Sequence, residues 1–266
     1  MSLTLKELRC LSPTDLLSKT YQLTKNPSFL TRPEGYEILE LIINAALLTS
    51  NNELANQCLA RLTDRFPTSP RVKVLQGMTL EAQGKTLEAL KFYEKCLEED
   101  STNIAIMKRK EAVFKSAGRT GDSIKLIISI LDSFPTDSES WSELAELYIS
   151  IDLMTQAAFC FEELIVLNPY SYSTFARYGE VVFLQGEYQD SLKAFLRSVE
   201  LCNGYARGWY GVKMSISRLL DSKSESPEYF KLDLLATEQL LQLSKNADEE
   251  ERIAIEKLVA KYYRNH

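Results

Sequence analysis

The sequence predicts an all-α chain built from stacked helix-turn-helix repeats, and three observations predict it. First, a period of 34 residues relates Gly84, Gly118 and Gly186. Second, only 10 glycines and 8 prolines occur in 266 residues, and these residue types disfavour helix interiors. Third, large apolar residues recur three or four apart, which places them along one helix face. This period is typical of tetratricopeptide (TPR) units, so we expect a TPR-type α-solenoid, a right-handed superhelix with capping helices at both ends.

Successive units begin, in an unbroken 34-residue step, at Tyr36, Pro70, Ile104, Ser138, Tyr172 and Ala206. The unit at Ser138 is the most complete, with Trp141 and Leu144 on its first helix and Ala157 and Phe161 on its second. Large residues of the first helix pack where the second helix presents a small one. Pro169 then ends the unit, because proline cannot continue the helical hydrogen bonding.

The whole chain, residues 1–266, is predicted to be one solenoid domain. Its segments are an N-terminal capping region (1–35), five TPR-like units (36–205), a last unit (206–246) with an expanded turn at 221–228, and a C-terminal capping helix (247–266). Ser12 and Pro13 form a good helix start. The unit at Ile104 is weaker, since Glu111 stands where a small residue is usual.

The residues that chemistry requires are scarce. The single histidine, His266, leaves little room for a Ser-His-Asp triad or a histidine metal site. The five cysteines form no CxxC pair, and we interpret them as small core residues of a reducing compartment. No phosphate-binding glycine motif is present. We therefore expect neither an enzyme nor a bound cofactor or metal.

The net charge and the hydropathy of the chain indicate which classes of partner are disfavoured. The net charge of −6 and the pI of about 5.2 disfavour a general nucleic-acid binder, which usually has a basic face. The longest apolar run, 38–48, contains Glu40 and Asn44 and is too short to span a membrane. The N-terminus lacks the apolar core of a signal peptide. These features predict a chain that stays on the cytosolic side.

In a TPR stack, the first helices line a concave groove, and unit positions 2, 5, 9 and 12 face into it. The groove residues that we expect to bind partners are Arg71, Val74, Met78, Lys108, Lys115, Ser142, Glu146, Ile149, Ala176, Glu180, Phe183, Arg207, Tyr210 and Met214. Their apolar members suit extended peptides or partner helices. The alternative for each residue is that it only packs between adjacent units.

Residues at positions that helix packing does not determine are similar to those of one TPR family. The runs Trp141–Ile149 (WSELAELYI), Ala157–Leu164 (AAFCFEEL) and Ala206–Ser215 (ARGWYGVKMS) resemble the TPR family of subunit 2 of the endoplasmic-reticulum membrane protein complex. The resemblance covers about residues 70–220. It implies a non-catalytic scaffold, peripheral on the cytosolic side of the endoplasmic-reticulum membrane. Such a subunit cups cytosolic segments of the membrane-embedded subunits in a complex that inserts tail-anchored and multi-pass proteins.

Three other functions remain open. A soluble TPR adaptor or co-chaperone would bind peptide segments of other partners. Co-chaperones of this type hold a peptide carboxylate with Lys at position 5 and Asn at position 9, whereas here Asn44 at position 9 accompanies Glu40 at position 5. An enzyme carrying TPR helices lacks a non-repeat domain. RNA-binding helical repeats are disfavoured by the net charge.

Overall fold

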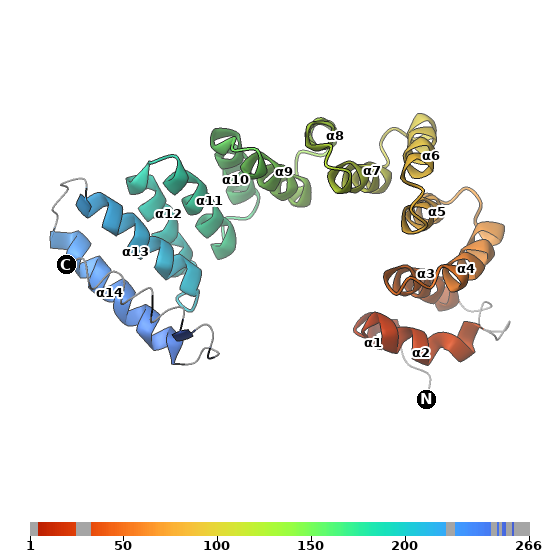
Figure 1. Cartoon of the computed structure of the whole chain (residues 1–266), viewed down its shortest axis with the longest axis horizontal. Coiled ribbons are helices and arrows are strands. Elements are labelled where there is room, and N and C mark those ends of the chain that lie inside the picture. The colour runs from red at the N-terminus through yellow and green to blue at the C-terminus, as the bar shows by residue number, and fades with distance from the viewer. Residues whose placement is uncertain are drawn as a thin grey trace. The chain divides into compact units, whose positions relative to one another are not determined.

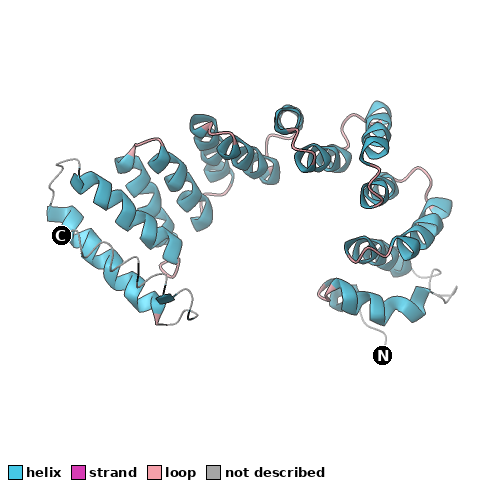
Figure 2. Ribbon diagram, in the orientation of Figure 1, coloured by secondary structure: helices cyan, strands magenta, loops and turns pink. Residues whose placement is uncertain are grey.

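The computed structural model of this chain describes residues 5–24, 33–221 and 227–245, together with positions 249, 252, 253 and 257. All regular structure in these residues is helical, which confirms the predicted fold class (Figures 1 and 2). The helices labelled in Figure 1 are α1 (Leu5–Arg9), α2 (Pro13–Thr24), α3 (Pro33–Leu48), α4 (Asn52–Arg65), α5 (Pro70–Ala82), α6 (Thr86–Glu99), α7 (Ile104–Ser116), α8 (Thr120–Ser133), α9 (Ser138–Ser150), α10 (Met154–Leu167), α11 (Tyr172–Leu184), α12 (Tyr188–Leu201), α13 (Ala206–Asp221) and α14 (Pro227–Ser244).

Contacts along the chain divide it into two compact units, which we call the N-terminal unit (Met1–Ser133) and the C-terminal unit (Phe134–His266). Within each unit, helices that are neighbours in sequence pack against each other. The N-terminal unit has one apolar cluster around α3 and α4 and a second around α6 and α7. In the C-terminal unit, an apolar cluster joins α11, α12, α13 and α14. Packing between neighbours in sequence is the property that defines a solenoid.

The 34-residue step is visible in the backbone. The helices α5, α7, α9, α11 and α13 each begin at position 1 of a unit, while α3 begins at Pro33, three residues before Tyr36. The turn after the first helix holds one residue in the left-handed region, and the same phase supplies it five times. These residues are Ser50 (φ 58°), Gly84 (φ 75°), Gly118 (φ 69°), Asp152 (φ 62°) and Gly186 (φ 87°). Glycine suits this position because it has no Cβ to clash there.

Position 8 of the first helix faces the second helix and decides how closely the two approach. At Gly77, an added Cβ would lie 2.1 Å from the ring of Tyr93, so only glycine fits against this fully buried tyrosine. Glu111 at the equivalent position is also buried, and the hydroxyl of Ser123 donates a hydrogen bond to it. A polar contact there replaces the usual small residue, which accounts for the weaker repeat pattern of that unit.

Lys213 is the second exception at position 8. Its ammonium group donates to Asp233 Oδ1 and to Thr237 Oγ1, each at 2.7 Å, and the lysine is only 3% exposed. Burial of a charge is tolerated when it is paired and hydrogen-bonded. These contacts tie α13 to α14 beside the buried Ala236 and Leu240.

The ends of the chain are described in part. The predicted helix start at Ser12 is confirmed, because α2 begins at Pro13 and the Ser12 hydroxyl accepts a hydrogen bond from the Asp15 amide at 3.2 Å. Residues 222–226 of the predicted expanded turn lie outside the described residues, as does most of the predicted C-terminal capping helix. Of the helices that the structure describes, none has both the length and the apolar character needed to cross a membrane.

Candidate functional site

The N-terminal unit carries a pocket of about 790 Å³, which we call the N-terminal pocket. It lies along the first helices α3, α5 and α7, whose side chains form its walls. Its apolar lining consists of Leu47, Leu48, Pro70, Val74, Leu75, Met78, Ala82 and Ala105. Leu48 is 76% exposed at its edge. An open apolar surface of this kind can receive apolar side chains of another molecule.

The charged residues of the N-terminal pocket are paired with each other. Arg71 of α5 forms an ion pair with Glu40 of α3 at 2.5 Å, and Arg109 of α7 pairs with Glu81 of α5. Each arginine therefore reaches back to the preceding first helix. Because two cations meet two anions, the pocket presents balanced charge, which does not select a charged ligand.

Two uncharged polar groups accompany these pairs. The buried Tyr93 donates its hydroxyl hydrogen bond to Glu81, and burial, followed by that hydrogen bond, raises the pKa of this tyrosine well above its usual value. Asn44 also lines the pocket, and its Oδ1 is buried with no hydrogen-bond partner in the described part of the chain. Buried polar atoms are normally hydrogen-bonded, so this oxygen is suited to accept a hydrogen bond from a ligand.

The C-terminal unit presents a smaller and more polar pocket of about 450 Å³, which we call the C-terminal pocket. It lies among α9, α10 and the start of α11. Its lining consists of Ser138, Glu139, Ser142, Glu143, Glu146, Phe161, Leu164, Asn168, Ser173, Thr174 and Arg177. Hydroxyl and carboxylate groups outnumber apolar side chains here, in contrast to the N-terminal pocket.

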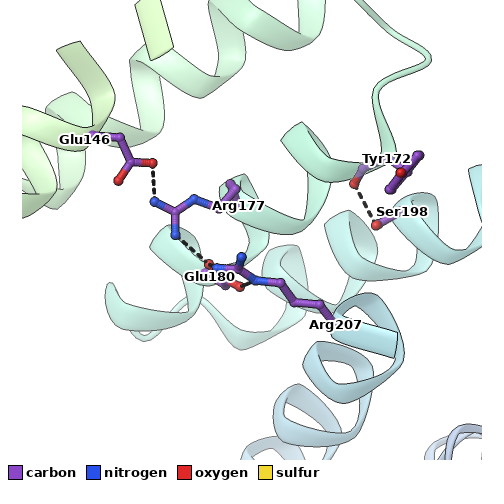
Figure 3. Close-up of polar contacts among 6 residues, drawn as sticks. All are labelled: Glu146, Tyr172, Arg177, Glu180, Ser198 and Arg207. Carbon is purple, nitrogen blue, oxygen red and sulfur yellow. Dashed lines mark hydrogen bonds and ion pairs between the residues drawn. The ribbon is translucent and has the colours of Figure 1, made fainter. Parts of the chain in front are cut away.

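Four charged residues cross the first helices of the C-terminal unit in alternating sign, and we call them the Glu–Arg ladder (Figure 3). Arg177 of α11 pairs with Glu146 of α9 and, at 3.2 Å, with Glu180 one turn further along α11. Arg207 of α13 donates to both oxygens of Glu180, with Nη2 at 2.7 Å. The hydrogen bond to Glu180 raises the pKa of Arg207 above its usual value. The ladder thus joins three successive first helices.

A backbone contact supports the same region. The Ser198 hydroxyl of α12 donates to the Tyr172 carbonyl at 2.7 Å, which ties the start of α11 to α12 (Figure 3). Ser198 itself is completely buried. The helix that carries Arg177 and Glu180 is therefore fixed at its N-terminus by the second helix of its own repeat.

The structure places the predicted groove residues in several settings. It gathers Arg71, Val74 and Met78 in the N-terminal pocket, and Ser142 and Glu146 in the C-terminal pocket. Glu180 and Arg207 belong to the Glu–Arg ladder. The remaining residues with accessible side chains are Lys108, Lys115, Ile149, Phe183, Tyr210 and Met214.

Ala176 differs from the others because it is completely buried. Side chains of the α11–α14 cluster close over its methyl group, so it presents no surface to a partner.

The sequence places Glu40, Asn44 and Glu81 at groove positions but gives them no partner, and sequence reasoning missed Arg109 and Arg177. A signal for these two arginines exists in the repeat itself. Arg109 and Arg177 both occupy position 6 of their units, two repeats apart. Their partners could not be assigned from that phase, because Arg109 pairs with position 12 of the preceding unit and Arg177 with position 9.

Metal chemistry finds no support in the described residues, where no three His, Cys, Asp or Glu side chains gather as a potential metal site. The buried thiols fit a structural role, since burial raises the pKa of Cys160 to about 12. A protonated thiol is a poor nucleophile and a poor metal ligand.

Comparisons with known proteins point to one family. A family model described as the EMC2 TPR-like repeat domain matches residues 63–196. The TPR repeat protein oca3 of Schizosaccharomyces pombe is 40% identical over 71% of this chain and 69% of its own length. The ER membrane protein complex subunit 2-B of Xenopus laevis is 39% identical over 67% of this chain. The match spans 61% of the frog protein, less than two thirds of its length.

More distant and structural matches agree on the fold. The ER membrane protein complex subunit 2 of Saccharomyces cerevisiae is 23% identical over 88% of this chain and 85% of its own length. The crystal structure of the TPR protein YrrB has a TM-score of 0.55 and 14% identity, covering 75% of this chain and 97% of YrrB. The crystal structure of the C-terminal part of a TPR repeat-containing protein from Cytophaga hutchinsonii has a TM-score of 0.58 and 13% identity. It covers 82% of this chain and 92% of that structure.

Proposed function

The chain belongs to the EMC2 TPR-like repeat family of non-catalytic scaffolds, and from this premise we propose that it is a scaffold subunit of the endoplasmic-reticulum membrane protein complex. In that role it lies peripherally on the cytosolic side of the membrane, within a complex that inserts tail-anchored and multi-pass proteins. Its partners are the membrane-embedded and cytosolic subunits of that complex. The faces of its first helices bind cytosolic segments of the membrane-embedded subunits.

The observation that carries the binding mode is the N-terminal pocket. Its apolar wall is large enough for several side chains, and exposed apolar surface of this kind marks interaction sites. Met78 and Val74 lie on the wall, with Ala82 one turn beyond Met78. A partner segment placed there buries apolar side chains against α5, and Asn44 accepts a hydrogen bond from it.

The charge balance of the pocket favours such a segment over the carboxylate terminus of a chaperone tail. Both arginines, Arg71 and Arg109, already face a glutamate. A carboxylate ligand would have to compete with Glu40 and Glu81 for these cations. The structure therefore favours an internal segment with apolar anchors as the ligand.

The experiment is recovery of the membrane subunits with tagged variants of the chain from detergent-solubilised membranes, measured by quantitative mass spectrometry. We expect Met78→Glu and Ala82→Glu to reduce recovery at least several-fold, because a carboxylate then occupies the apolar wall. Ala60→Glu, which changes an exposed alanine of α4 away from the pocket, is the matched control and should recover the complex normally.

Ala82 is itself exposed, so its substitution tests binding without disturbing the core. Circular dichroism should show equal helicity for all three variants. Normal recovery with Ala82→Glu and Met78→Glu would overturn the pocket assignment. Recovery of cytosolic chaperones in place of membrane subunits by the unmodified chain would favour the TPR adaptor instead.

A further inference from the structure

The outer face of α10 carries large apolar side chains that are exposed to solvent. Phe159 is 53% exposed and Val166 is 76% exposed, and their spacing of seven residues places them two turns apart on one side of the helix. Between them on the same side lie Glu162, which is exposed, and Glu163, which is half-buried. Tyr170, which is 77% exposed, follows in the turn after the helix. We call Phe159, Val166 and Tyr170 the α10 patch.

The α10 patch lies on the opposite side of α10 from the C-terminal pocket. Phe161 and Leu164 of this helix line that pocket. Each of them is two residues away from Phe159 or Val166, which corresponds to about 200° around the helix. The patch is therefore a surface separate from the pocket and from the first helices.

The other second helices have polar or charged residues where α10 has Phe159 and Val166. The helices α4, α6, α8, α10 and α12 all occupy unit positions 17–30, so their outer faces can be compared position by position. The equivalents are Gln57, Lys91, Lys125 and Lys193 at position 22, and Asp64, Glu98, Asp132 and Glu200 at position 29. Packing of the repeat thus requires no apolar residue at either position. Exposed apolar residues that depart from the local pattern in this way indicate an interaction site.

Phe159 is held in place before any partner binds. Its ring meets that of Trp141 on α9 edge to face, with the centroids 6.0 Å apart. The Trp141 indole in turn donates a hydrogen bond to the Pro135 carbonyl at 2.8 Å. A side chain that is already ordered loses little conformational entropy on binding, so Phe159 is suited to act as an anchor.

The charge around the α10 patch is negative. The helix packs against α9 and α11, and these three helices together contain a single lysine or arginine, Arg177. That arginine pairs with Glu146 and Glu180. Glu162 and Glu163 therefore border the patch without a cation from α9, α10 or α11 to balance them.

We propose that the α10 patch docks an amphipathic helix of a partner protein, whose apolar residues are flanked by lysine or arginine. Apolar anchors spaced by three, four or seven residues cover Phe159 and Val166. The flanking cations of the partner face Glu162 and Glu163, which gives electrostatic complementarity.

The charge of the patch disfavours two other occupants. A second copy of the chain in a two-fold dimer would bring the same glutamates of both copies together, because such an interface is self-complementary. An anionic lipid surface would likewise meet charge of its own sign. The proposal goes beyond the role of the N-terminal pocket and does not depend on it.

Binding is measured by fluorescence anisotropy, with the full-length chain and a fluorescein-labelled peptide as the probe. The peptide is an amphipathic helix with leucine on one face and lysine on the other, and the matched peptide has glutamate in place of each lysine. We expect the lysine peptide to bind and the glutamate peptide to bind at least several-fold more weakly.

The decisive variant combines Phe159→Lys with Val166→Glu, which gives α10 the residues that α12 has at these positions. The net charge of the chain stays the same, so general attraction of the lysine peptide is unchanged. We expect binding to fall at least several-fold. Val166→Glu alone, at a highly exposed position, provides the same test if the double variant loses helicity by circular dichroism. Leu184→Glu, on an exposed leucine of α11, adds the same charge outside the patch and should bind the peptide normally.

A second pair of variants tests the role of charge. Glu162→Gln with Glu163→Gln should weaken binding of the lysine peptide several-fold and reduce its dependence on salt. Glu187→Gln with Glu200→Gln removes the same charge from exposed positions of α12 and should have a smaller effect. Equal effects of the two pairs would overturn the charge complementarity of the patch.

Other outcomes would overturn the docking proposal itself. One is binding of the lysine peptide that survives both Val166→Glu and the double substitution. Loss of binding in Met78→Glu but not in Val166→Glu would place the peptide in the N-terminal pocket instead. A dimer in sedimentation velocity that Val166→Glu dissociates would assign the patch to a second copy. Flotation with phosphatidylcholine–phosphatidylserine vesicles that Val166→Glu abolishes would assign it to a lipid surface.

Discussion

In the N-terminal unit, α3, α5 and α7 enclose an apolar pocket of about 790 Å³, in which two Arg–Glu pairs balance each other. In the C-terminal unit, α9, α11 and α13 carry instead a continuous Glu–Arg ladder, beside a polar pocket of about 450 Å³. Both surfaces are made by first helices of the same 34-residue repeat. They differ in the side chains at positions that the packing of helix pairs leaves free.

The difference teaches that the repeat and its surface chemistry are set by separate residues. Position 8 and its partners on the second helix determine how the two helices pack, as Gly77 and Tyr93 do. The groove positions then give the N-terminal unit a surface for apolar anchors. In the C-terminal unit, Arg207 at a groove position and Arg177 at position 6 hold neighbouring first helices together.

The largest difference between the two units in the free energy of unfolding should come from removing one tyrosine hydroxyl group in each. Tyr93→Phe removes a hydrogen bond to Glu81 beside the N-terminal pocket, where the ring is fully buried. We expect a loss of about 1–3 kcal/mol in the free energy of unfolding, because a partly buried carboxylate loses a donor. Tyr178→Phe removes an exposed hydrogen bond to Glu162 in the C-terminal unit and should cost about 0.5 kcal/mol.

Urea denaturation followed by circular dichroism measures both variants against the unmodified chain. Both substitutions keep the aromatic ring, so packing is matched and only the hydroxyl differs. Equal losses in the free energy of unfolding would mean that the two units bury these polar contacts to the same extent. That result would contradict the proposed difference in burial.

A smaller effect should follow from loss of the central cation of the ladder. Arg177→Met leaves Glu146 and Glu180 without the guanidinium between them. We expect a loss of up to about 1 kcal/mol at low salt, since surface ion pairs contribute little individually and more in networks. At an ionic strength of about 1 M the loss should shrink, because the screening length falls to about 3 Å.

The matched variant in the N-terminal unit is Arg71→Met, which removes an isolated pair whose arginine is 68% exposed. It should change the free energy of unfolding by less than Arg177→Met at low salt. A loss for Arg177→Met that is independent of salt would show that the methylene groups of this side chain, and not its charge, hold α9, α11 and α13 together.

The sequence predicted the helical repeat because its signals are local and periodic. Pro13 begins a helix as its residue type indicated, and Gly84, Gly118 and Gly186 hold the same turn position, as their period indicated. It could not predict the pairing of Arg109 with Glu81 or of Arg177 with Glu146, because position 6 can reach several positions of the preceding helix. The choice among them depends on the angle between first helices, which many packing contacts set jointly.

Substitution at the left-handed turn position should change the free energy of unfolding to a similar extent in both units. The difference between the units would then be confined to their grooves. Ser50 in the N-terminal unit and Asp152 in the C-terminal unit occupy this position with positive φ. Substitution by glycine relieves the Cβ contact but loosens the unfolded chain. We expect a net gain of about 0.5 kcal/mol for Ser50→Gly and somewhat less for Asp152→Gly, since aspartate tolerates this conformation better.

Thermal and urea denaturation of the two glycine variants measure these gains. Similar small gains support a turn that the repeat dictates in the same way along the chain. A marked loss for one variant alone would show that its side chain has a role specific to its unit.

The smallest effect concerns alkaline pH. Burial, and then the hydrogen bond to Glu162, raise the pKa of Tyr178 from 10.0 to about 12. Because the folded state holds the phenol proton more tightly than the unfolded chain, the contribution of this group to stability is complete below pH 10. It is lost as the pH rises from 10 towards 12. Urea midpoints measured across this range should therefore fall less steeply for Tyr178→Phe than for the unmodified chain.

Tyr93 provides the contrast within the same titration. Its pKa is raised more strongly, by deeper burial and by Glu81, so its loss of stability begins at the same pH as that of Tyr178 and continues to a higher pH. Tyr93→Phe should consequently lower the midpoint at every pH below 10 and should also flatten the slope between pH 10 and 12, at least as much as Tyr178→Phe does, because unfolded Tyr93 ionises there while the folded group keeps its proton. A slope that Tyr178→Phe leaves unchanged would contradict the raised pKa of Tyr178 and would leave Tyr93 as the source of the alkaline sensitivity.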